Sequence, residues 1–300
     1  MKKNILLHFG IYPIILLAMM FWGMSFVWSS IVFKYYNPIT TIFLRLVIST
    51  LLLSLFIYFT GKFERLKKED RILFLLSSLF NPFLYFMGEN FGLKNSSPTI
   101  SAVIIATIPL FAPVAAYLAL NEKITWLTIA GIFISFIGVG IMLVNPDLTL
   151  NASPAGIAFL LGAVLSAVIY SVFLKKLTLR YSSLTIITYQ NALGILYFFP
   201  LFLIFDFNHF LTVKPNHELI SSLLQLSVFA SSLAFVFFTM AVKELGVSRT
   251  NVFSNLIPVF TAIFSAIFIS EMFTATKIAG MAAVIAGVMI SQWKRRTVGR

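Results

Sequence analysis

Residues 96–143 read SSPTISAVIIATIPLFAPVAAYLALNEKITWLTIAGIFISFIGVGIML, and residues 246–290 read GVSRTNVFSNLIPVFTAIFSAIFISEMFTATKIAGMAAVIAGVMI. A single offset of 149 residues aligns this part of the chain with its copy without a gap. Such self-similarity at a fixed spacing indicates a duplicated unit. Six identical pairs support the alignment: Lys94 and Lys243, Pro109 and Pro258, Glu122 and Glu271, Thr125 and Thr274, Gly131 and Gly280, Gly138 and Gly287.

The composition of the whole chain is typical of a membrane-embedded protein. Of its 300 residues, 59% are hydrophobic and 11% are charged, and the mean hydropathy is +0.96. Soluble domains carry about 25% charged residues. The absence of cysteine excludes disulfides and thiolate chemistry. The composition therefore excludes a disordered chain, a disulfide-stapled scaffold and a cytosolic enzyme.

Uncharged apolar runs recur along the chain, and each is about the length of a helix that crosses the ~30 Å hydrocarbon layer. Helices are expected because lipid offers no hydrogen-bond partner to open backbone groups. A membrane β-barrel would instead show alternating segments of about 10 residues. We predict ten spans, at residues 11–33, 39–60, 72–93, 97–120, 124–144, 154–174, 184–205, 219–242, 250–270 and 274–293.

The repeat and the spans together predict the fold class, an all-α integral membrane protein with ten transmembrane helices in two inverted five-helix repeats. The first repeat occupies residues 1–149 and the second residues 150–300. Because each unit has an odd number of spans, the second unit must enter the membrane from the opposite side. This plan is typical of secondary transporters, whose substrate site lies near the midplane between the halves.

The charges predict the orientation of these spans. With the N-terminus inside, 17 Lys and Arg residues fall on the inner side and 4 on the outer side, while Arg45 lies within a span. Positive charge collects on the cytoplasmic side of membrane proteins. We therefore expect both termini in the cytoplasm and the chain in the cytoplasmic (inner) membrane. The same distribution accounts for the net charge of +12 without a nucleic-acid partner.

The paired stretches resemble the EamA domains of the drug/metabolite transporter superfamily. The resemblance rests on a proline in mid-span, Glu and Thr at the end of the span, and two glycines seven residues apart. Trp22–Gly23 and the sequence FLR ending at Arg45 also fit, and the resemblance covers residues 11–293. It implies ten helices, an inner-membrane location and transport of small organic metabolites or drugs.

Pro109 and Pro258 stand near the middle of corresponding spans. Each removes one helical hydrogen bond, so we expect the carbonyls of Ile105 and Ser254 to be free. Interrupted helices at matching places in two halves point to a transporter's binding site. The alternative interpretation is a packing kink that touches no ligand.

Polar residues at helical spacing give further candidates. Asn251, Asn255 and Pro258 share one helical face, and so do Asn81, Tyr85 and Glu89. These faces should point into protein or into a wet cavity, because polar groups are expensive in lipid. For the asparagines on the first face, the alternative is a hydrogen bond between helices.

Ionisable residues inside a span are functional candidates by default. Glu89 could bind a proton or a substrate amine, and Arg45 a substrate carboxylate. The alternatives are a structural Arg45–Glu89 pair, or Glu89 reaching the outer surface. A weaker alignment of the earlier spans, at an offset of about 145, sets Gln190 opposite Arg45.

Aromatic and hydroxyl residues complete the candidate site. Trp22 and Ser25 lie on one stripe of the first span, and Tyr170 lies on the sixth. The aromatic rings could stack on a substrate, although with 33 phenylalanines in the chain most aromatic side chains face lipid or packing. Glu122 and Glu271 are expected to anchor turns at the ends of their spans.

Two other functions were weighed against a carrier. A membrane-embedded enzyme should show a catalytic motif such as HExxH or GxSxG, and the sequence has neither. A channel should show a polar ring lining a pore. We therefore predict a secondary active transporter, not an enzyme, that works by alternating access as a monomer or a homodimer. Its partners are a small-molecule substrate and the lipid bilayer, with proton coupling as a hypothesis, and it needs no cofactor or metal.

Overall fold

The computed structural model describes residues 2–111, 115, 126–143, 152–272 and 274–292. These residues form helices and no strands, as expected for an all-α membrane protein. The α-helices are α1 (Lys2–Val32), α2 (Pro38–Thr60), α3 (Arg71–Ser78), α4 (Tyr85–Lys94), α5 (Pro98–Ile105), α7 (Trp126–Leu143), α8 (Pro154–Thr178), α9 (Ser183–Leu201), α10 (Phe207–Thr212), α11 (His217–Gln225), α12 (Phe235–Leu245), α13 (Val247–Asn251), α14 (Ile257–Ile269) and α15 (Ala275–Gln292). Shorter 3-10 or π segments are η1 (Lys68–Asp70), η2 (Leu79–Leu84), η3 (Phe202–Asp206), η4 (Leu226–Ala234) and η5 (Val252–Leu256).

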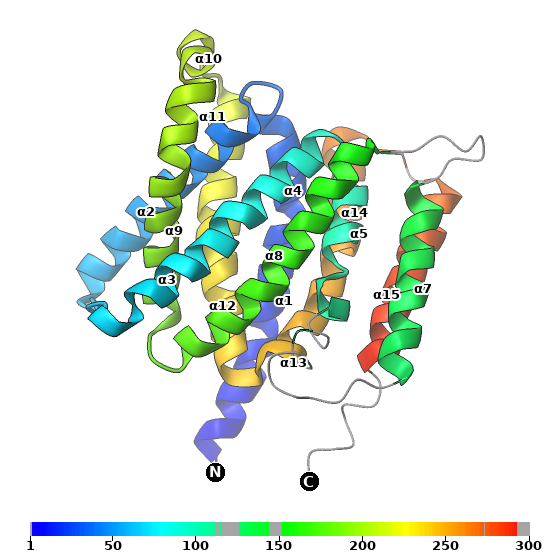
Figure 1. Cartoon of the computed structure of the whole chain (residues 1–300), viewed down its shortest axis with the longest axis horizontal. Helices are drawn as coiled ribbons and strands as arrows, with labels where there is room; N and C mark the ends of the chain where they lie inside the picture. Colours follow the sequence, from blue (N-terminus) through cyan, green and yellow to red (C-terminus); the bar gives the residue numbers. More distant parts are fainter. Residues whose placement is uncertain (1, 112–114, 116–125, 144–151, 273, 293–300) are drawn as a thin grey trace.

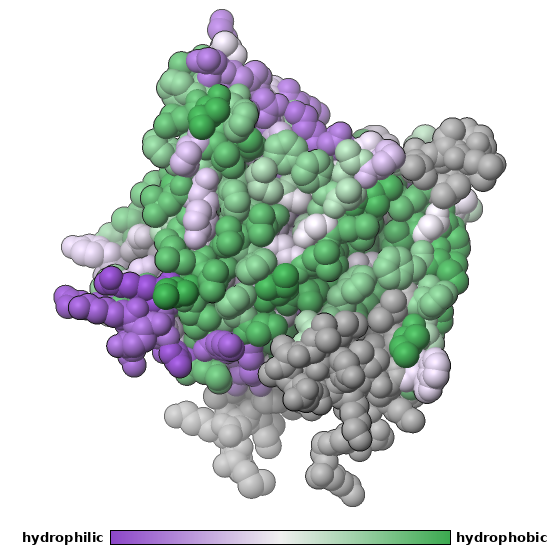
Figure 2. All heavy atoms as spheres, viewed as in Figure 1, coloured by the Kyte–Doolittle hydropathy of each residue, from purple (hydrophilic) through white to green (hydrophobic). Residues whose placement is uncertain are grey.

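Six continuous helical stretches are long and apolar enough to cross a membrane. They are Gly10–Val32, Pro38–Thr60, Lys68–Lys94, Pro154–Thr178, Ser183–Thr212 and His217–Leu245. Four shorter apolar stretches accompany them: Pro98–Phe111, Ile129–Leu143, Phe253–Ile269 and Ala275–Gly287. Figure 2 shows a broad hydrophobic belt between hydrophilic residues at two ends of the molecule. The protein is therefore a multi-pass, all-α membrane protein.

Helices from the first half of the chain pack against helices from the second half. The most extensively packed pairs are α7 with α15, α4 with α8, α1 with α14, and α2 with α9. Each pair takes one helix from before residue 144 and one from after residue 151. In Figure 1, α7 and α15 run side by side at one edge of the bundle, and α1 begins and α15 ends at the same end of it.

Glycines let these pairs approach closely. A Cβ at Gly138 would lie 2.7 Å from the carbonyl oxygen of Gly280, and one at Gly287 would lie 2.6 Å from that of Gly131. Real Cβ atoms do not approach oxygen so closely, so the backbones of α7 and α15 could not come this close at these positions if either residue carried a side chain. The duplicated glycines of the repeat therefore lie where α7 and α15 approach each other closely.

Helix breaks occur where the prolines predict them. The helix α5 ends at Ile105, and Ala106 and Thr107 form a turn before a short helical segment that contains Pro109. In the second half the segment η5 precedes α14, and Pro258 lies in the first turn of α14. The two breaks lie at positions 149 residues apart.

Two details differ from the sequence-based expectations. The carbonyl of Ser254 is not free, because it accepts a hydrogen bond from the backbone N–H of Ile257. The residues between the predicted spans 184–205 and 219–242 are mostly helical, because α10 and the start of α11 leave only residues 213–216 irregular. The prolines predict where the helices break. The 3-10 geometry of η5, which satisfies the Ser254 carbonyl, depends on packing in the folded protein.

Candidate functional site

A cavity lies where α1, α4, α8 and α12 meet the broken segments around Ile105 and Ser254. Its volume is about 70 Å³, which is room for a few water molecules and well below the roughly 300–1,000 Å³ of ligand pockets. Six of the sequence candidates line it: Trp22, Asn81, Tyr85, Glu89, Tyr170 and Asn251.

Glu89 is the one charged side chain among the described residues that line the cavity. Its exposed fraction is 9%. Tyr85 donates a hydrogen bond of 2.8 Å to Oε1 of Glu89, and the Asn90 amide lies 3.5 Å from Oε2. Tyr85 and Glu89 share a face of α4 as predicted, whereas Asn81 reaches the same cavity from a kink where its backbone is not helical. Glu89 therefore does not extend to the outer surface.

Arg45 lies outside the cavity. Its Nε donates to the Ser231 hydroxyl at 2.6 Å, and its guanidinium lies 4.2 Å from the centre of the Phe86 ring. Within the described part of the chain, no ion pair of 4 Å or less joins Arg45 to Glu89. The direct Arg45–Glu89 pair that the sequence left open is therefore not formed. A cation–π contact and a hydroxyl hold the guanidinium instead.

Gln190 stands behind the cavity wall rather than in it. Its side-chain oxygen accepts a hydrogen bond of 3.0 Å from the Tyr170 hydroxyl, and its amide donates to Ser77 at 2.6 Å. Gln190 thus fixes the position of the Tyr170 ring, which does line the cavity. The structure assigns Gln190 a supporting place through Tyr170.

Four other candidates are close to the cavity without lining it. Ser25 donates to the Trp22 carbonyl at 2.7 Å within its own helix. Pro109 and Pro258 lie just beyond the broken segments whose residues Ile105, Ser254 and Ile257 line the cavity. The Asn255 side chain is buried, and neither its amide nitrogen nor its oxygen has a hydrogen-bond partner.

The sequence did not single out the phenylalanines of the aromatic wall. Phe235 and Phe238 line the cavity, and each ring centre lies 5.0 Å from that of Trp22. Among 33 phenylalanines nothing marked these two, although their spacing of three places them on one helical face. The wall combines apolar rings with the Glu89 carboxylate and two amides. Such a lining suits a small organic molecule with an apolar body and a polar group.

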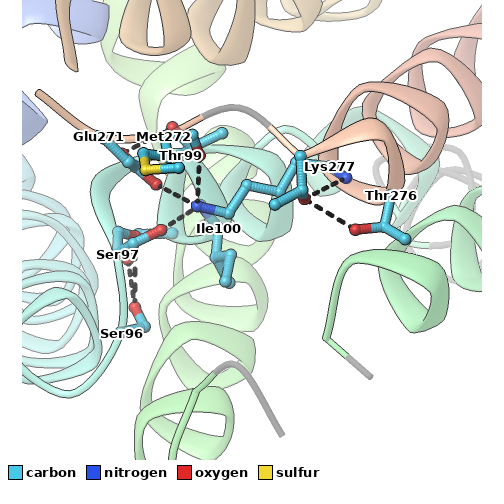
Figure 3. A network of polar contacts seen from close by, with 10 residues as sticks. Ser96, Ser97, Thr99, Ile100, Glu271, Met272, Thr276 and Lys277 are labelled. Atoms are coloured by element: carbon cyan, nitrogen blue, oxygen red, sulfur yellow. Dashed lines mark hydrogen bonds and ion pairs between the residues drawn. The ribbon is translucent and has the colours of Figure 1, made fainter. Parts of the chain in front are cut away.

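A partly buried carboxylate, Glu271, lies outside the cavity (Figure 3). It bonds Thr99 at 2.9 Å and Lys277 at 2.9 Å. Burial raises the pKa of Glu271, but hydrogen bonds from Ser97 and Lys277 outweigh it, so the pKa lies below its ordinary value. The expected role as a turn anchor is confirmed for Glu271, whereas Glu122 lies outside the described residues. In the described chain no group of three or more His, Asp or Glu side chains could hold a metal.

Comparison with known proteins adds the family. The EamA-like transporter family matches residues 10–144 and again residues 154–293. An uncharacterized transporter of Archaeoglobus fulgidus is 27% identical over 94% of this chain and 98% of its own length. The uncharacterized transporter YetK of Bacillus subtilis is 25% identical over 96% of this chain and 88% of its own.

Two further likenesses concern a named exporter and the fold. A probable terminal-alkyne amino-acid exporter of Streptantibioticus cattleyicolor is 26% identical over 70% of this chain and 69% of its own. One crystal structure superposes with a TM-score of 0.72 at 14% identity, over 94% of this chain and 98% of its own, which supports the fold alone. With the family matching both parts of the sequence and its relatives named as transporters rather than enzymes, this chain belongs to the EamA-like transporter family and is a membrane transporter.

Proposed function

We propose that this protein is a secondary active transporter that carries a small organic metabolite or drug across the cytoplasmic membrane by alternating access. The observation that carries the proposal is a cavity lined from both parts of the chain, with Glu89 on one side and Asn251 on the other. The likeness to a probable amino-acid exporter supports a small organic substrate. Because the cavity is narrower than a metabolite, it must widen to admit one.

The proposed architecture has ten membrane crossings in two inverted repeats, residues 1–149 and 150–300. Six long and four shorter apolar stretches provide the crossings. Matching breaks before Pro109 and Pro258, and helix pairs drawn from both repeats, support the symmetry. Exchange of the two repeats' conformations would then convert an outward-open carrier into an inward-open one.

The proposed residues of transport fall into three groups. Glu89, Tyr85, Asn81, Asn251, Trp22 and Tyr170 contact the substrate. Gln190, Ser25 and Arg45 hold the wall in place from behind. Pro109 and Pro258, with the unpartnered Asn255, allow the broken segments to move. Glu89 is the proposed coupling group, which takes up a proton or a substrate amine.

The experiment that tests this function starts from the substrate. Metabolites would be compared between cells with and without the protein, and the compound whose distribution changes would be loaded into proteoliposomes. A carrier shows counterflow that saturates with substrate, and its flux changes with the pH gradient if protons are coupled. Flux that rises linearly with concentration and shows no counterflow would indicate a channel and overturn the proposal.

Glu89→Gln and Glu69→Gln provide the matched variants for this assay. Glu69 is an exposed carboxylate in the 3-10 segment η1 before α3, and it does not line the cavity. Saturable flux should be lost in the first variant and kept in the second. Flux that is the same in both variants would remove Glu89 from the mechanism.

A further inference from the structure

Two clusters of polar contacts join the first half of the chain to the second. In one cluster Asp70, just before α3, accepts hydrogen bonds from the Arg180 guanidinium and from the Tyr181 hydroxyl, the latter at 2.7 Å. Arg180 and Tyr181 follow directly after α8. The exposed fraction of the Asp70 side chain is 2%.

The other cluster has the same kinds of side chain, but here the acid lies in the second half and the basic residue and tyrosine lie in the first. Glu218, in the first turn of α11, accepts hydrogen bonds from Nζ of Lys34 at 3.1 Å and from the Tyr35 hydroxyl at 2.5 Å. Lys34 and Tyr35 follow directly after α1. In each cluster a basic residue and a tyrosine, adjacent in sequence, hold an acid at the start of a helix from the other half.

The positions of these residues match as well as their chemistry. An offset of 146 carries Lys34 to Arg180 and Tyr35 to Tyr181, and an offset of 148 carries Asp70 to Glu218. Both offsets are close to that of the main repeat. The two clusters are therefore related by the duplication. The acid comes from the first half in one cluster and from the second half in the other.

A second acid reinforces each cluster at a helix N-terminus. Glu64 accepts a hydrogen bond of 3.0 Å from the backbone N–H of Ser182, at the start of α9. Asp206 accepts one of 3.0 Å from the backbone N–H of Thr40, in the first turn of α2, and another of 2.9 Å from its hydroxyl. Free N–H groups and the helix dipole favour a carboxylate at this place.

The pKa of Glu64 is consistent with this arrangement. Burial raises the pKa of Glu64, but the hydrogen bonds from Ser182 and Thr185 outweigh it and place the pKa below its ordinary value. The ionised carboxylate is therefore the form that the start of α9 stabilises.

The two clusters lie at opposite ends of the bundle. In Figure 1, α3 begins and α8 ends at the lower end, whereas α1 ends and α11 begins at the upper end. We call Glu64, Asp70, Arg180, Tyr181 and Ser182 the α3 clasp, and Lys34, Tyr35, Thr40, Asp206 and Glu218 the α11 clasp.

We propose that the α3 clasp and the α11 clasp are the gating contacts of the transport cycle, each holding one face of the protein closed and opening in turn. The proposal rests on the alternating-access function proposed above. When one half rocks against the other, groups from different halves separate at the face that opens. Because each clasp joins both halves at one end, that face cannot open widely while its clasp is intact.

The two clasps differ in strength. The Lys34 and Glu218 side chains are 56% and 47% exposed, so solvent screens their attraction. Asp70 is buried, and separating it from its partners would leave a charge that must be hydrated again. The α11 face should therefore open more readily than the α3 face in the absence of substrate.

The test uses labelling from each face of the membrane. The natural chain has no cysteine, so Ser171→Cys, at a cavity-lining position, gives a single reporter without background. A membrane-impermeant maleimide is applied to right-side-out and to inside-out vesicles. Asp70→Asn should raise the labelling rate from the α3 face and lower it from the α11 face, and Glu218→Gln should do the reverse. For loss of a charged hydrogen bond the expected change is about tenfold.

Control variants separate gating from folding. Glu69→Gln removes an exposed neighbouring carboxylate and should leave labelling unchanged from both faces. The exchange Lys34→Glu with Glu218→Lys should restore the natural labelling ratio. If Asp70→Asn does not fold, Tyr181→Phe removes one clasp hydrogen bond while keeping the charge and should shift labelling in the same direction.

The outcomes also distinguish this proposal from the proposed function. A reporter that is labelled from one face only in the natural background, with or without substrate, would overturn alternating access and the clasps together. A reporter labelled from both faces whose rates do not shift in opposite directions in the clasp variants would overturn the clasps and leave the carrier function standing.

Discussion

At the scale of single residues, Glu89 and Arg45 show how two buried charges can have different tasks. Glu89 faces the cavity beside the Tyr85 hydroxyl, while Arg45 is turned toward Ser231 and the Phe86 ring. A charge that faces a cavity can exchange its partner for a ligand. A charge enclosed by a ring and a hydroxyl is held in place, which favours the proposed supporting role of Arg45 over contact with substrate.

Glu89→Gln should lower saturable transport by about tenfold or more, because one charged hydrogen-bonding group is lost from the cavity. The substitution keeps size and an acceptor for the Tyr85 hydroxyl, so the thermal unfolding temperature should change little. Transport kinetics in proteoliposomes and unfolding in detergent measure the two effects. A large loss of stability with normal transport per folded molecule would contradict the assignment.

Asn255→Leu should stabilise the protein while it impairs transport. The Asn255 amide is buried without a partner, and removing such a group relieves a desolvation penalty of about 1–3 kcal/mol. Asn191→Leu is the matched control, since the Asn191 amide donates to Ser49 at 2.8 Å and to the Ser231 carbonyl at 3.2 Å. That control should lower the free energy of unfolding, and equal effects of both substitutions would refute the prediction.

The pH dependence of stability should contain a contribution from Glu271. Its pKa in the folded protein lies below the ordinary value of 4.5, so the ionised form stabilises the fold above pH 4.5. This contribution is lost as the pH falls through the folded-state pKa. Unfolding temperatures of the natural protein and Glu271→Gln should therefore differ near neutral pH and converge in acid. A constant difference across the range would exclude this linkage.

At the scale of helices, the breaks and the glycine contacts determine which parts can move and which cannot. The broken segments before Pro109 and Pro258 border the cavity. By contrast, a Cβ at Gly88 of α4 would lie 2.5 Å from the Phe159 carbonyl oxygen of α8. This close backbone contact fixes the spacing of α4 and α8 at Gly88.

Gly88→Ala should destabilise the protein by about 1–3 kcal/mol, because the added methyl group overpacks the α4–α8 contact. Gly162→Ala is the control on the partner helix, since a Cβ at Gly162 meets nothing within 4 Å. That substitution should raise stability by up to about 1 kcal/mol through better helix propensity. Thermal unfolding of both variants checks the contrast, and similar shifts in both would show that the close approach is absent.

At the scale of the whole molecule, helices from the two halves are paired throughout, and hydrophilic residues collect at the two ends of a hydrophobic belt. The clasps join the same halves at those ends. The proposed carrier is thus one membrane unit in which the interface between halves contains both the cavity and the proposed gates.

The orientation of this unit can be tested with reporter fusions. A fluorescent protein fused after Arg300 should fold and fluoresce, because the C-terminus is expected in the cytoplasm. Alkaline phosphatase inserted in the irregular residues 213–216 should be active, because this connection is expected outside. A C-terminal fusion that is made but does not fluoresce, together with phosphatase activity at residues 213–216, would put the C-terminus on the outer face and overturn the inverted arrangement.

Sequence reasoning located what depends on spacing along one helix. The shared face of Tyr85 and Glu89 follows from helical periodicity, and the breaks near Pro109 and Pro258 follow from proline's missing N–H. The partner of Arg45 could not be predicted in this way, because a long flexible side chain finds its contacts only in the folded bundle.

The clasps went unnoticed although the sequence carries a signal for them. Lys34–Tyr35 and Arg180–Tyr181 are matching dipeptides at an offset close to that of the repeat. Polar pairs in loops are common, so the match becomes informative only when the acids they bind, Asp70 and Glu218, are known.

The pairing of α7 with α15, α4 with α8, α1 with α14 and α2 with α9 has a consequence for assembly. A gene split at the connection between residues 144 and 151 would encode two fragments, each lacking the partners for its own helices. Coexpressed in one cell, the fragments should recognise each other and reconstitute the working protein, whereas either fragment alone should be degraded. Such reconstitution would show that the single polypeptide behaves as a tethered heterodimer, the form expected if an ancestral gene for one half first made a self-associating subunit.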